Sequence, residues 1–149
     1  AHIYRDLHIH AYIYPHFDTF AHVHTYTQGT LAPSFTASFN NLESCTGTGW
    51  WVDIALQNTG GLAFESLLVL FGDTANGTVL TLSSEDFINR DGCSITDTQS
   101  NLPPGFTRIV SLPVLAYDPS GHPIRSTIVL CSNPGRSGTC IAQSIDFTP

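Results

Sequence analysis

WWVDIALQNTGG, residues 50–61, is the stretch that decides the fold class of this chain. Aromatic and β-branched residues are frequent up to Leu56, and Asn58, Thr59 and Gly60 then form a turn signal. We therefore predict a strand over residues 50–58 that ends at this turn. Six more runs of this kind are predicted as strands, at residues 34–39, 65–71, 78–83, 107–117, 124–132 and 141–147. Seven short strands separated by turn residues predict an all-β, antiparallel β-sandwich.

The composition is that of a chain poor in helices. Charged residues make up only 11% of the chain, and Lys is absent. Thr, Ser, Gly, Phe, Tyr and Val are plentiful, a usage that favours strands over long solvated helices. Residues 84–88 are the one place where we expect a helical turn, because Ser84 can cap the Glu and Asp that follow it.

Charge and hydropathy exclude some classes of partner. The net charge is −7, and the five cations are single arginines spread along the chain, so no basic stripe exists to bind a nucleic acid. No run reaches the roughly 18 apolar residues that a membrane-spanning helix needs. The sequence starts at Ala1 rather than Met, which we interpret as processing after removal of an export signal. We expect a secreted protein that does not insert into membranes.

Four cysteines permit three disulfide pairings. Cys131 and Cys140 flank the polar loop CSNPGRSGTC, which a disulfide could clamp, and Cys45 and Cys93 then remain for each other. The alternative is four buried thiols in a cytosolic protein. The missing Lys and the processed start favour disulfides in an oxidising, extracellular environment.

Three segments carry a resemblance to a known family: WWVDIALQNTGGLAFESLLVLF (50–71), LPPGFTRIVSLPV (102–114) and RSTIVLC (125–131). With their Asn-Thr-Gly and Pro-Gly turns, they resemble the bacterial cell-adhesion-related Ig-like domains over about residues 35–147. The resemblance implies an Ig-like sandwich that serves as an extracellular scaffold or adhesion module. It implies no catalytic residues.

Residues 1–30 follow a different pattern. Aliphatic residues dominate the odd positions up to Val23, and His, Tyr and Asp dominate the even positions. This two-residue period predicts a long β-extension before a sandwich of residues 31–149. About 25 extended residues would span on the order of 80 Å, whereas a domain of this size is about 35 Å across. The segment therefore either folds back near Pro15 or leaves the domain to complete a neighbouring copy.

The second solution predicts a structural role. A donated strand pairs through its backbone and inserts alternate side chains into pockets of the acceptor. Head-to-tail donation does not close, so it produces an open filament of identical copies. This arrangement resembles that of donor-strand pilins. The predicted assembly residues are the apolar members of the odd row, namely Ile3, Leu7, Ile9, Ala11, Ile13, Phe17 and Val23.

Six of the seven histidines lie in the first 24 residues, and two HxH pairs stand out. These pairs are His8 with His10 and His22 with His24. If the chain reverses near His16, the four imidazoles come close enough together to bind Zn²⁺ or Cu²⁺. The alternative function is thus a monomeric secreted surface-binding module with a transition-metal site. The competing interpretation is a His/Tyr face that packs on a neighbour or meets water. We expect no other cofactor.

The remaining candidate sites have simple interpretations. One of Trp50 and Trp51 should point inward beside a disulfide, as in Ig cores, and the outward ring could stack on a carbohydrate. Residues 72–77 lack the alternating acids of a Ca²⁺ loop and are predicted to form a plain turn. No GxSxG, HExxH or SxxK motif occurs, so we expect no enzymatic activity.

Overall fold

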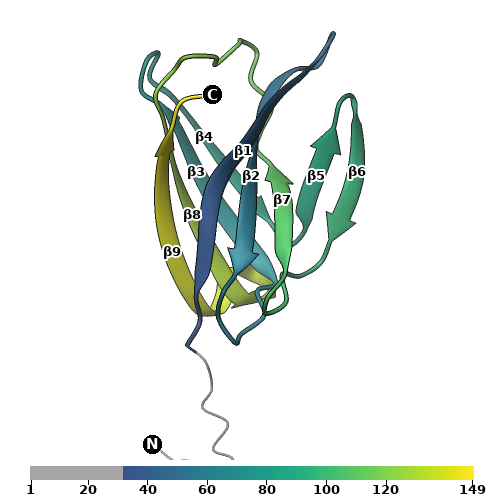
Figure 1. The fold of residues 1–149 in the computed structure, drawn as a ribbon, viewed down its shortest axis with the longest axis vertical. Coiled ribbons are helices and arrows are strands. Elements are labelled where there is room, and N and C mark those ends of the chain that lie inside the picture. Colours follow the sequence, from purple (N-terminus) through teal and green to yellow (C-terminus); the bar gives the residue numbers. More distant parts are fainter. Residues whose placement is uncertain (1–31) are drawn as a thin grey trace, which may run out of the picture.

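A computed structural model describes residues 32–149 as an all-β structure (Figure 1). The predictions for residues 1–30 lie outside the described part of the chain. Nine strands occur in residues 32–149: β1 (Phe35–Cys45), β2 (Gly49–Asn58), β3 (Ser66–Asp73), β4 (Thr78–Ser84), β5 (Phe87–Asp91), β6 (Ser94–Gln99), β7 (Thr107–Ser111), β8 (Ile124–Asn133) and β9 (Ser137–Phe147). A short 3₁₀ turn, η1 (Pro134–Arg136), joins β8 to β9. No helix within this part is long and apolar enough to cross a membrane.

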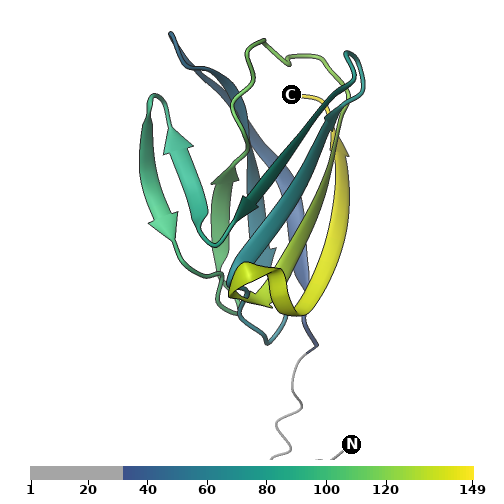
Figure 2. The ribbon, with the colours of Figure 1, turned by 180° about the vertical axis from the view of Figure 1, so that it is seen from behind.

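Two sheets pack face to face, and all strand pairs are antiparallel (Figures 1 and 2). One sheet has the order β1-β2-β7 and the other β4-β3-β8-β9, while β5 and β6 form a separate hairpin. Without the hairpin, seven strands remain in an Ig-like order, with the fourth strand added to the sheet of the last two. The predicted Ig-like antiparallel β-sandwich is confirmed.

The core between the sheets consists of aliphatic and aromatic side chains. Most come from the two sheets, because alternate residues of each strand point inward, while Phe64 and Leu102 lie outside the named strands and Phe87 lies in β5. The largest of those with almost no exposed surface are Ile54, Leu56, Phe64, Leu67, Phe71, Phe87, Leu102, Ile124, Ile128 and Leu130. Within residues 32–149, the members of this core lie between Phe35 and Phe147. They form one continuous hydrophobic cluster between the two sheets.

The chain enters the sandwich at one end and finishes at the other. Ser34 accepts hydrogen bonds from the amides of Thr59 and Gly60, just past the end of β2. We call this the entry end. At the opposite end, which we call the far end, the amide of Gly121 donates to the carbonyl of Pro149. The described chain thus runs from one end of the sandwich to the other (Figure 1).

The β5–β6 hairpin replaces the expected helical turn at residues 84–88, so that prediction is wrong. Three contacts hold the hairpin to the sandwich from a distance in sequence. The Cys45–Cys93 disulfide links its tip to the end of β1, the amide of Gly92 donates to the Glu43 carboxylate, and the amide of Arg90 donates to the hydroxyl of Ser111. The disulfide was predicted from the cysteine spacing, whereas a pattern search along the chain cannot detect the two hydrogen bonds.

Both predicted disulfides are confirmed. Cys45 pairs with Cys93, and Cys131 pairs with Cys140, which lies directly opposite it on the neighbouring strand. Neither disulfide joins the two sheets across the core, in contrast to the expectation of an Ig-type core with a tryptophan beside a bridge. The disulfides are consistent with an oxidising, extracellular environment.

The predicted strand at residues 107–117 is too long. β7 ends at Ser111, although Leu112 and Leu115 still donate backbone hydrogen bonds to Val52 and Trp50 of β2. Pro113 lies between them and has no amide hydrogen to donate, so the regular ladder stops there. Two other strands are longer than predicted, because β1 extends to Cys45 and β9 begins at Ser137.

Candidate functional site

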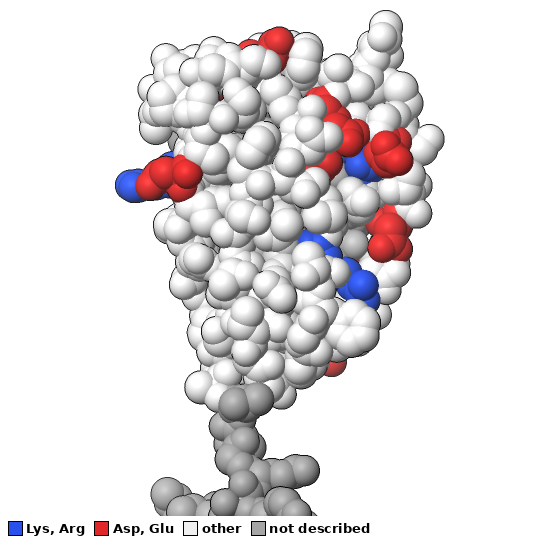
Figure 3. Space-filling view, viewed as in Figure 1, with Lys and Arg blue, Asp and Glu red and all other residues white. Residues whose placement is uncertain are grey.

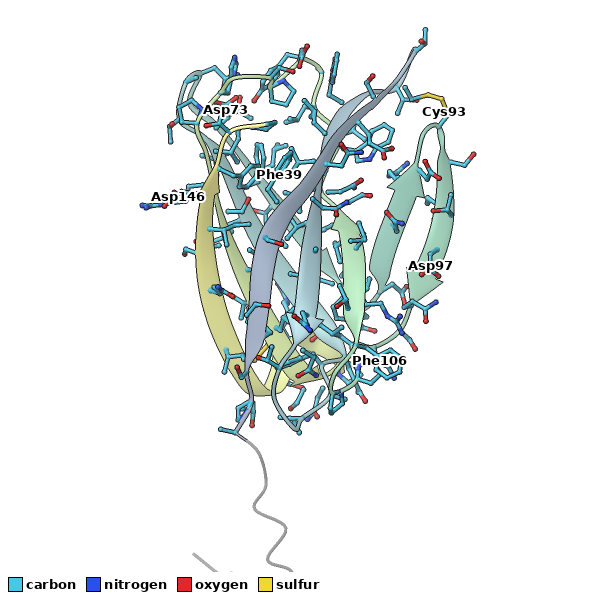
Figure 4. All side chains as sticks on the ribbon, in the orientation of Figure 1. Phe39, Asp73, Cys93, Asp97, Phe106 and Asp146 are labelled. Atoms are coloured by element: carbon cyan, nitrogen blue, oxygen red, sulfur yellow. A yellow bond between two sulfur atoms is a disulfide. The ribbon has the colours of Figure 1, made fainter. Side chains whose placement is uncertain are left out.

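The sheet edges are the natural candidates for a function based on strand pairing, because an edge strand carries unpaired backbone groups. The two sheets have four edge strands: β1, β7, β4 and β9. The edges of β1 and β9 lie against each other on one side of the sandwich. There the ring of Phe39, which is labelled in Figure 4, stacks on the ring of Phe147 with the two centroids 5.1 Å apart. This side of the core is closed by the protein's own side chains.

The edge of β7 is next to the hairpin. β5 runs beside β7 without forming a regular ladder with it (Figure 1). The Arg90 amide of β5 donates to the Ser111 hydroxyl of β7 over 2.8 Å. The hairpin therefore shields this edge.

The edge of β4 is different, because β3 is the only strand that runs alongside it within residues 32–149 (Figure 2). Its sequence TVLTLSS contains no charged residue and no proline. The other three edge strands each carry a charge, namely Glu43 in β1, Arg108 in β7 and Asp146 in β9. Charges and prolines are the usual means by which proteins protect a sheet edge from further pairing. β4 has neither.

A groove of about 100 Å³ lies between the end of β4, the hairpin and the segment that follows β7. Its lining combines five apolar residues, Leu82, Ile88, Leu112, Pro113 and Val114, with the polar residues Ser84, Asp86, Arg90 and Ser111. Leu80 and Leu82 point from β4 toward the core but stay partly exposed. The groove has room for one aliphatic side chain, and the two leucines offer further apolar surface beside it.

The outer face of the same edge is also apolar. Val79 in β4 is 73% exposed, and Leu70 in β3 is 43% exposed. Figure 3 shows a different face of the molecule, the one with β1 and β2 in front. Charged side chains are few on that face, and most of those visible lie on the side of β5 and β6. Among residues 32–149, the β4 edge thus combines backbone groups left unpaired by any described strand with apolar side chains on both faces.

A second cluster of polar residues lies at the far end, around the buried Asp73 (Figure 4). Its carboxylate accepts hydrogen bonds from the Tyr117 hydroxyl (2.7 Å) and the Ala75 amide (2.9 Å), and lies 2.7 Å from Nδ1 of His122. Burial opposes ionisation of the carboxyl, but these three hydrogen bonds outweigh it and lower the pKa of Asp73. The cluster connects the 73–78 turn to the loop before β8.

A third polar group lies beneath the hairpin. Asp53 is buried in the middle of β2, and the Ser111 hydroxyl donates to it over 2.6 Å. Burial raises the pKa of Asp53, the Ser111 hydrogen bond partly offsets this, and the nearby charges of Glu43 and Asp91 raise it further. Residues 51–54 are all buried. The core covers one face of β2 at these positions, and the β5–β6 hairpin lies on the side of the other face.

The tryptophan pair differs from the expectation. Trp50 packs partly buried against the core, whereas Trp51 lies on the opposite face of β2, opposite Glu43 of β1. Trp51 is only 1% exposed, so its ring is not available to stack on a carbohydrate, and that expectation is wrong. Its indole nitrogen is buried and has no hydrogen-bond partner among residues 32–149.

The other site predictions have mixed outcomes. Residues 72–77 include the expected turn, and the Asp73 carboxylate there already binds three neighbouring groups. No three His, Cys, Asp or Glu side chains within residues 32–149 converge to hold a metal ion. His8, His10, His22 and His24 lie outside these residues, as do the seven predicted assembly residues. Sequence reasoning missed the Asp73 cluster and the open β4 edge. The signal for the edge was present in the chain, namely a strand with neither charge nor proline.

Comparisons with known proteins returned no family model, no curated protein and no solved structure that matches this chain.

Proposed function

We propose that this protein is the structural subunit of an extracellular filament, which polymerises when residues 1–30 of one copy add a β-strand to the next. The observation that carries the proposal is the two-residue alternation of residues 1–26, which creates an aliphatic row. Residues 35–147 supply a hydrophobic core between the two sheets. In the proposed assembly, a hydrophobic surface of the neighbouring copy covers the aliphatic row.

Two features of the described residues support this proposal. The β4 edge is unprotected and has apolar surface on both faces. The two disulfides suit a protein that works outside the cell, where no reducing agents open them.

Deletion of residues 1–30 tests the proposal. The deleted protein should fold, because its core and both disulfides remain, and it should stay a monomer where the full chain forms filaments. Light scattering and negative-stain microscopy measure the difference. Truncated protein that still forms filaments would refute strand donation. Truncated protein that does not fold would place residues 1–30 within their own sandwich.

Point substitutions give a sharper version of this test. Changing Ile9 and Ile13 to Asp puts charges into the aliphatic row and should abolish assembly. The matched control changes His8 and His10 to Ser, which alters the other face of the same segment and should have a mild effect. Equal loss in both double variants would contradict a role for the aliphatic row.

The alternative function is a monomeric surface-binding module that holds a transition metal with His8, His10, His22 and His24. The HxH pairs are the observation that favours it. Calorimetry with Zn²⁺ or Cu²⁺ at pH 7.5 would then show stoichiometric binding that disappears as the pH falls through the imidazole range. Elution of the full chain at its monomer mass of 16.1 kDa, together with such binding, would replace the filament proposal.

A further inference from the structure

We infer that the edge of β4 is the acceptor site for the donated strand, and that residues 7–13 of a second copy pair with it in antiparallel orientation. This inference rests on the proposed function. It adds which edge is used, which part of the extension binds there and in which direction. Of the four edge strands within residues 32–149, β4 alone has no second described strand beside it and no charge or proline in its sequence.

The length of β4 selects the donor segment. β4 has seven residues, and residues 7–13, LHIHAYI, form a run of the same length in which every odd position is aliphatic. Pro15 follows two residues later, and a proline ends regular pairing in a sheet. The later odd positions of the extension include Thr19 and Ala21, so they offer less apolar surface.

The positions of the two ends of the sandwich determine the direction of pairing. β4 runs from the far end toward the entry end, because Thr78 lies opposite Asp73 and Ser84 lies opposite Leu67 at the start of β3. A segment that turned back from the entry end of its own copy would run parallel to β4. A segment donated by a copy stacked beyond the far end would enter there and run antiparallel to β4.

Antiparallel pairing is the arrangement of every other strand pair in this sandwich and is slightly the more stable of the two. The 18 residues from 14 to 31 can span at most about 60 Å when extended, which is enough to reach a neighbouring copy. Head-to-tail stacking therefore accounts for both the direction and the length of the connection.

This direction also fits the side chains. When residues 7–13 are laid against residues 84–78, Ile9 lies opposite Leu82 and Ala11 lies opposite Leu80. Directly opposite residues point to the same face of a sheet. The aliphatic row then covers the half-exposed leucines of β4, and Leu7 or Ile9 reaches the groove beside Ile88 and Leu112.

On the outer face the same register brings Tyr12 opposite Val79, the most exposed of the large hydrophobic residues in the described chain. Aromatic and β-branched residues are a favourable cross-strand pair. His10 lies opposite Thr81 and His8 opposite Ser83, so both histidines face solvent. A register shifted by one residue would instead place these histidines against the core.

Photo-crosslinking of the full-length protein tests the inference. Benzoylphenylalanine replaces the exposed Thr81 in β4, and in a control it replaces the exposed Ala142 in β9, an edge strand that already lies against β1. Unlabelled and nitrogen-15-labelled copies are mixed before assembly, so that mass spectrometry distinguishes links within a copy from links between copies. We expect adducts between Thr81 and the residues around His10 of another copy, and none at Ala142.

The possible results separate the acceptor site from the proposed function. Adducts between copies that join residues 7–13 to the β9 position, or to another strand, would leave strand donation intact but overturn β4 as the acceptor. Adducts between copies near Leu7 rather than His10 would overturn the register. Adducts found only within single copies would overturn both strand donation and the β4 assignment. A sample that stays monomeric and gives no adducts would do the same.

A matched pair of substitutions provides a second readout. Leu82→Glu puts a charge at the β4 edge, and Ile145→Glu puts one at the equivalent half-buried, core-facing position of the β9 edge. Leu82→Glu should lower the yield of filaments at least tenfold. Ile145→Glu should leave the yield within about twofold of the unmodified chain, once circular dichroism shows that both variants are folded. Equal loss in the two folded variants would overturn the β4 assignment.

Discussion

Asp73 and Asp53 are both buried carboxylates, yet their pKa values move in opposite directions. Both lose contact with water, which favours the neutral acid. Asp73 receives three hydrogen bonds that stabilise its charged form, whereas Asp53 receives one from Ser111 and lies near two other acids. The hydrogen bonds to Asp73 outweigh the effect of burial on its pKa, whereas burial and the two neighbouring acids prevail at Asp53.

Replacement of Asp73 by Asn should destabilise the sandwich by about 1–3 kcal/mol at pH 7, because hydrogen bonds to a buried charge are lost. The lowered pKa means that this stabilisation is present above the ordinary value of 3.8 and disappears as the pH falls through the lower native value. Urea unfolding should therefore show a difference between Asp73→Asn and the unmodified protein that shrinks below about pH 3.8. Asp146→Asn, which affects the exposed pair with Arg125, is the control and should cause a smaller loss. A constant difference down to pH 2 would contradict the assignment.

Replacement of Asp53 by Asn should have the reverse effect. A raised native pKa means that protonation favours the folded state, so the charged form of Asp53 weakens the fold as the pH rises through that value. Asn is neutral and can still accept the Ser111 hydrogen bond. We expect Asp53→Asn to be at least as stable as the unmodified protein at pH 7, with any advantage gone at pH 3 to 4. Urea midpoints at the two pH values measure this, and a clear loss of stability at pH 7 would show that the charge itself is needed.

The hydrogen bonds of Asp73 could not have been predicted from the sequence, because Tyr117 and His122 are 44 and 49 residues away. What the sequence did contain was an aspartate at the end of an apolar run, where a buried charge requires partners. The tryptophan pair illustrates the same limit. Alternation correctly predicted that Trp50 and Trp51 would face opposite sides of β2, but not that a hairpin from a later part of the chain would lie on the side of Trp51.

At the scale of single elements, the β5–β6 hairpin depends most on distant contacts. Few of its residues are buried, apart from Phe87, which reaches the core. Its tip is attached by the Cys45–Cys93 bridge, which spans 48 residues of sequence, whereas Cys131–Cys140 spans nine. A longer closed loop restricts the unfolded chain more.

Removal of the Cys45–Cys93 bridge, with both residues changed to Ala, should therefore cost about 4 kcal/mol by the loop-entropy relation, against about 2.5 kcal/mol for Cys131–Cys140. Urea unfolding of the two double variants measures the order. Hydrogen exchange adds a local readout, since amides of β5 and β6 should lose protection in the first variant only. The prediction is contradicted if the second variant is the less stable or if the hairpin amides remain equally protected.

Strand prediction succeeded where a strand faces the core and failed where it does not. β2, β3, β4 and β8 have regular apolar positions, and their predicted limits are close to the observed ones. β6 has mostly exposed residues, so no apolar period marks it. The one available signal was Asp91-Gly92, a dipeptide favoured in hairpin turns, and no strand was predicted on either side of it.

At the scale of the whole molecule, assembly should raise resistance to unfolding. Burial of Leu7, Ile9 and Ile13 against an acceptor contributes about 1.5–3 kcal/mol for each side chain before ordering costs are subtracted. Filaments of the full chain should therefore unfold at a higher denaturant concentration than the protein without residues 1–30, and the difference should grow with protein concentration. Intrinsic fluorescence of the two tryptophans measures both transitions. Coincident transitions at all concentrations would contradict strand donation.

Fold class and both cysteine pairs were predictable because they depend on alternation and on the number and spacing of a few residues. The arrangement of strands into two sheets, and hence which edges are protected, was not. It depends on which strands meet in space, for example β2 with β7 and β3 with β8. The protected state of β1 and β9 follows from a contact between Phe39 and Phe147, residues from opposite ends of the described chain.

The covalent attachment of β1 has a mechanical consequence. Tension on the chain ahead of Phe35 would pull β1 along its own axis, across the ladder that joins it to β2. The hydrogen bonds of that ladder lie perpendicular to the strands, so they bear the load together rather than one after another. At the other end of β1, Cys45 is bonded to the hairpin, and this bond would stop the strand from sliding out. A pulling force would thus be passed into the rest of the sandwich instead of extracting its first strand.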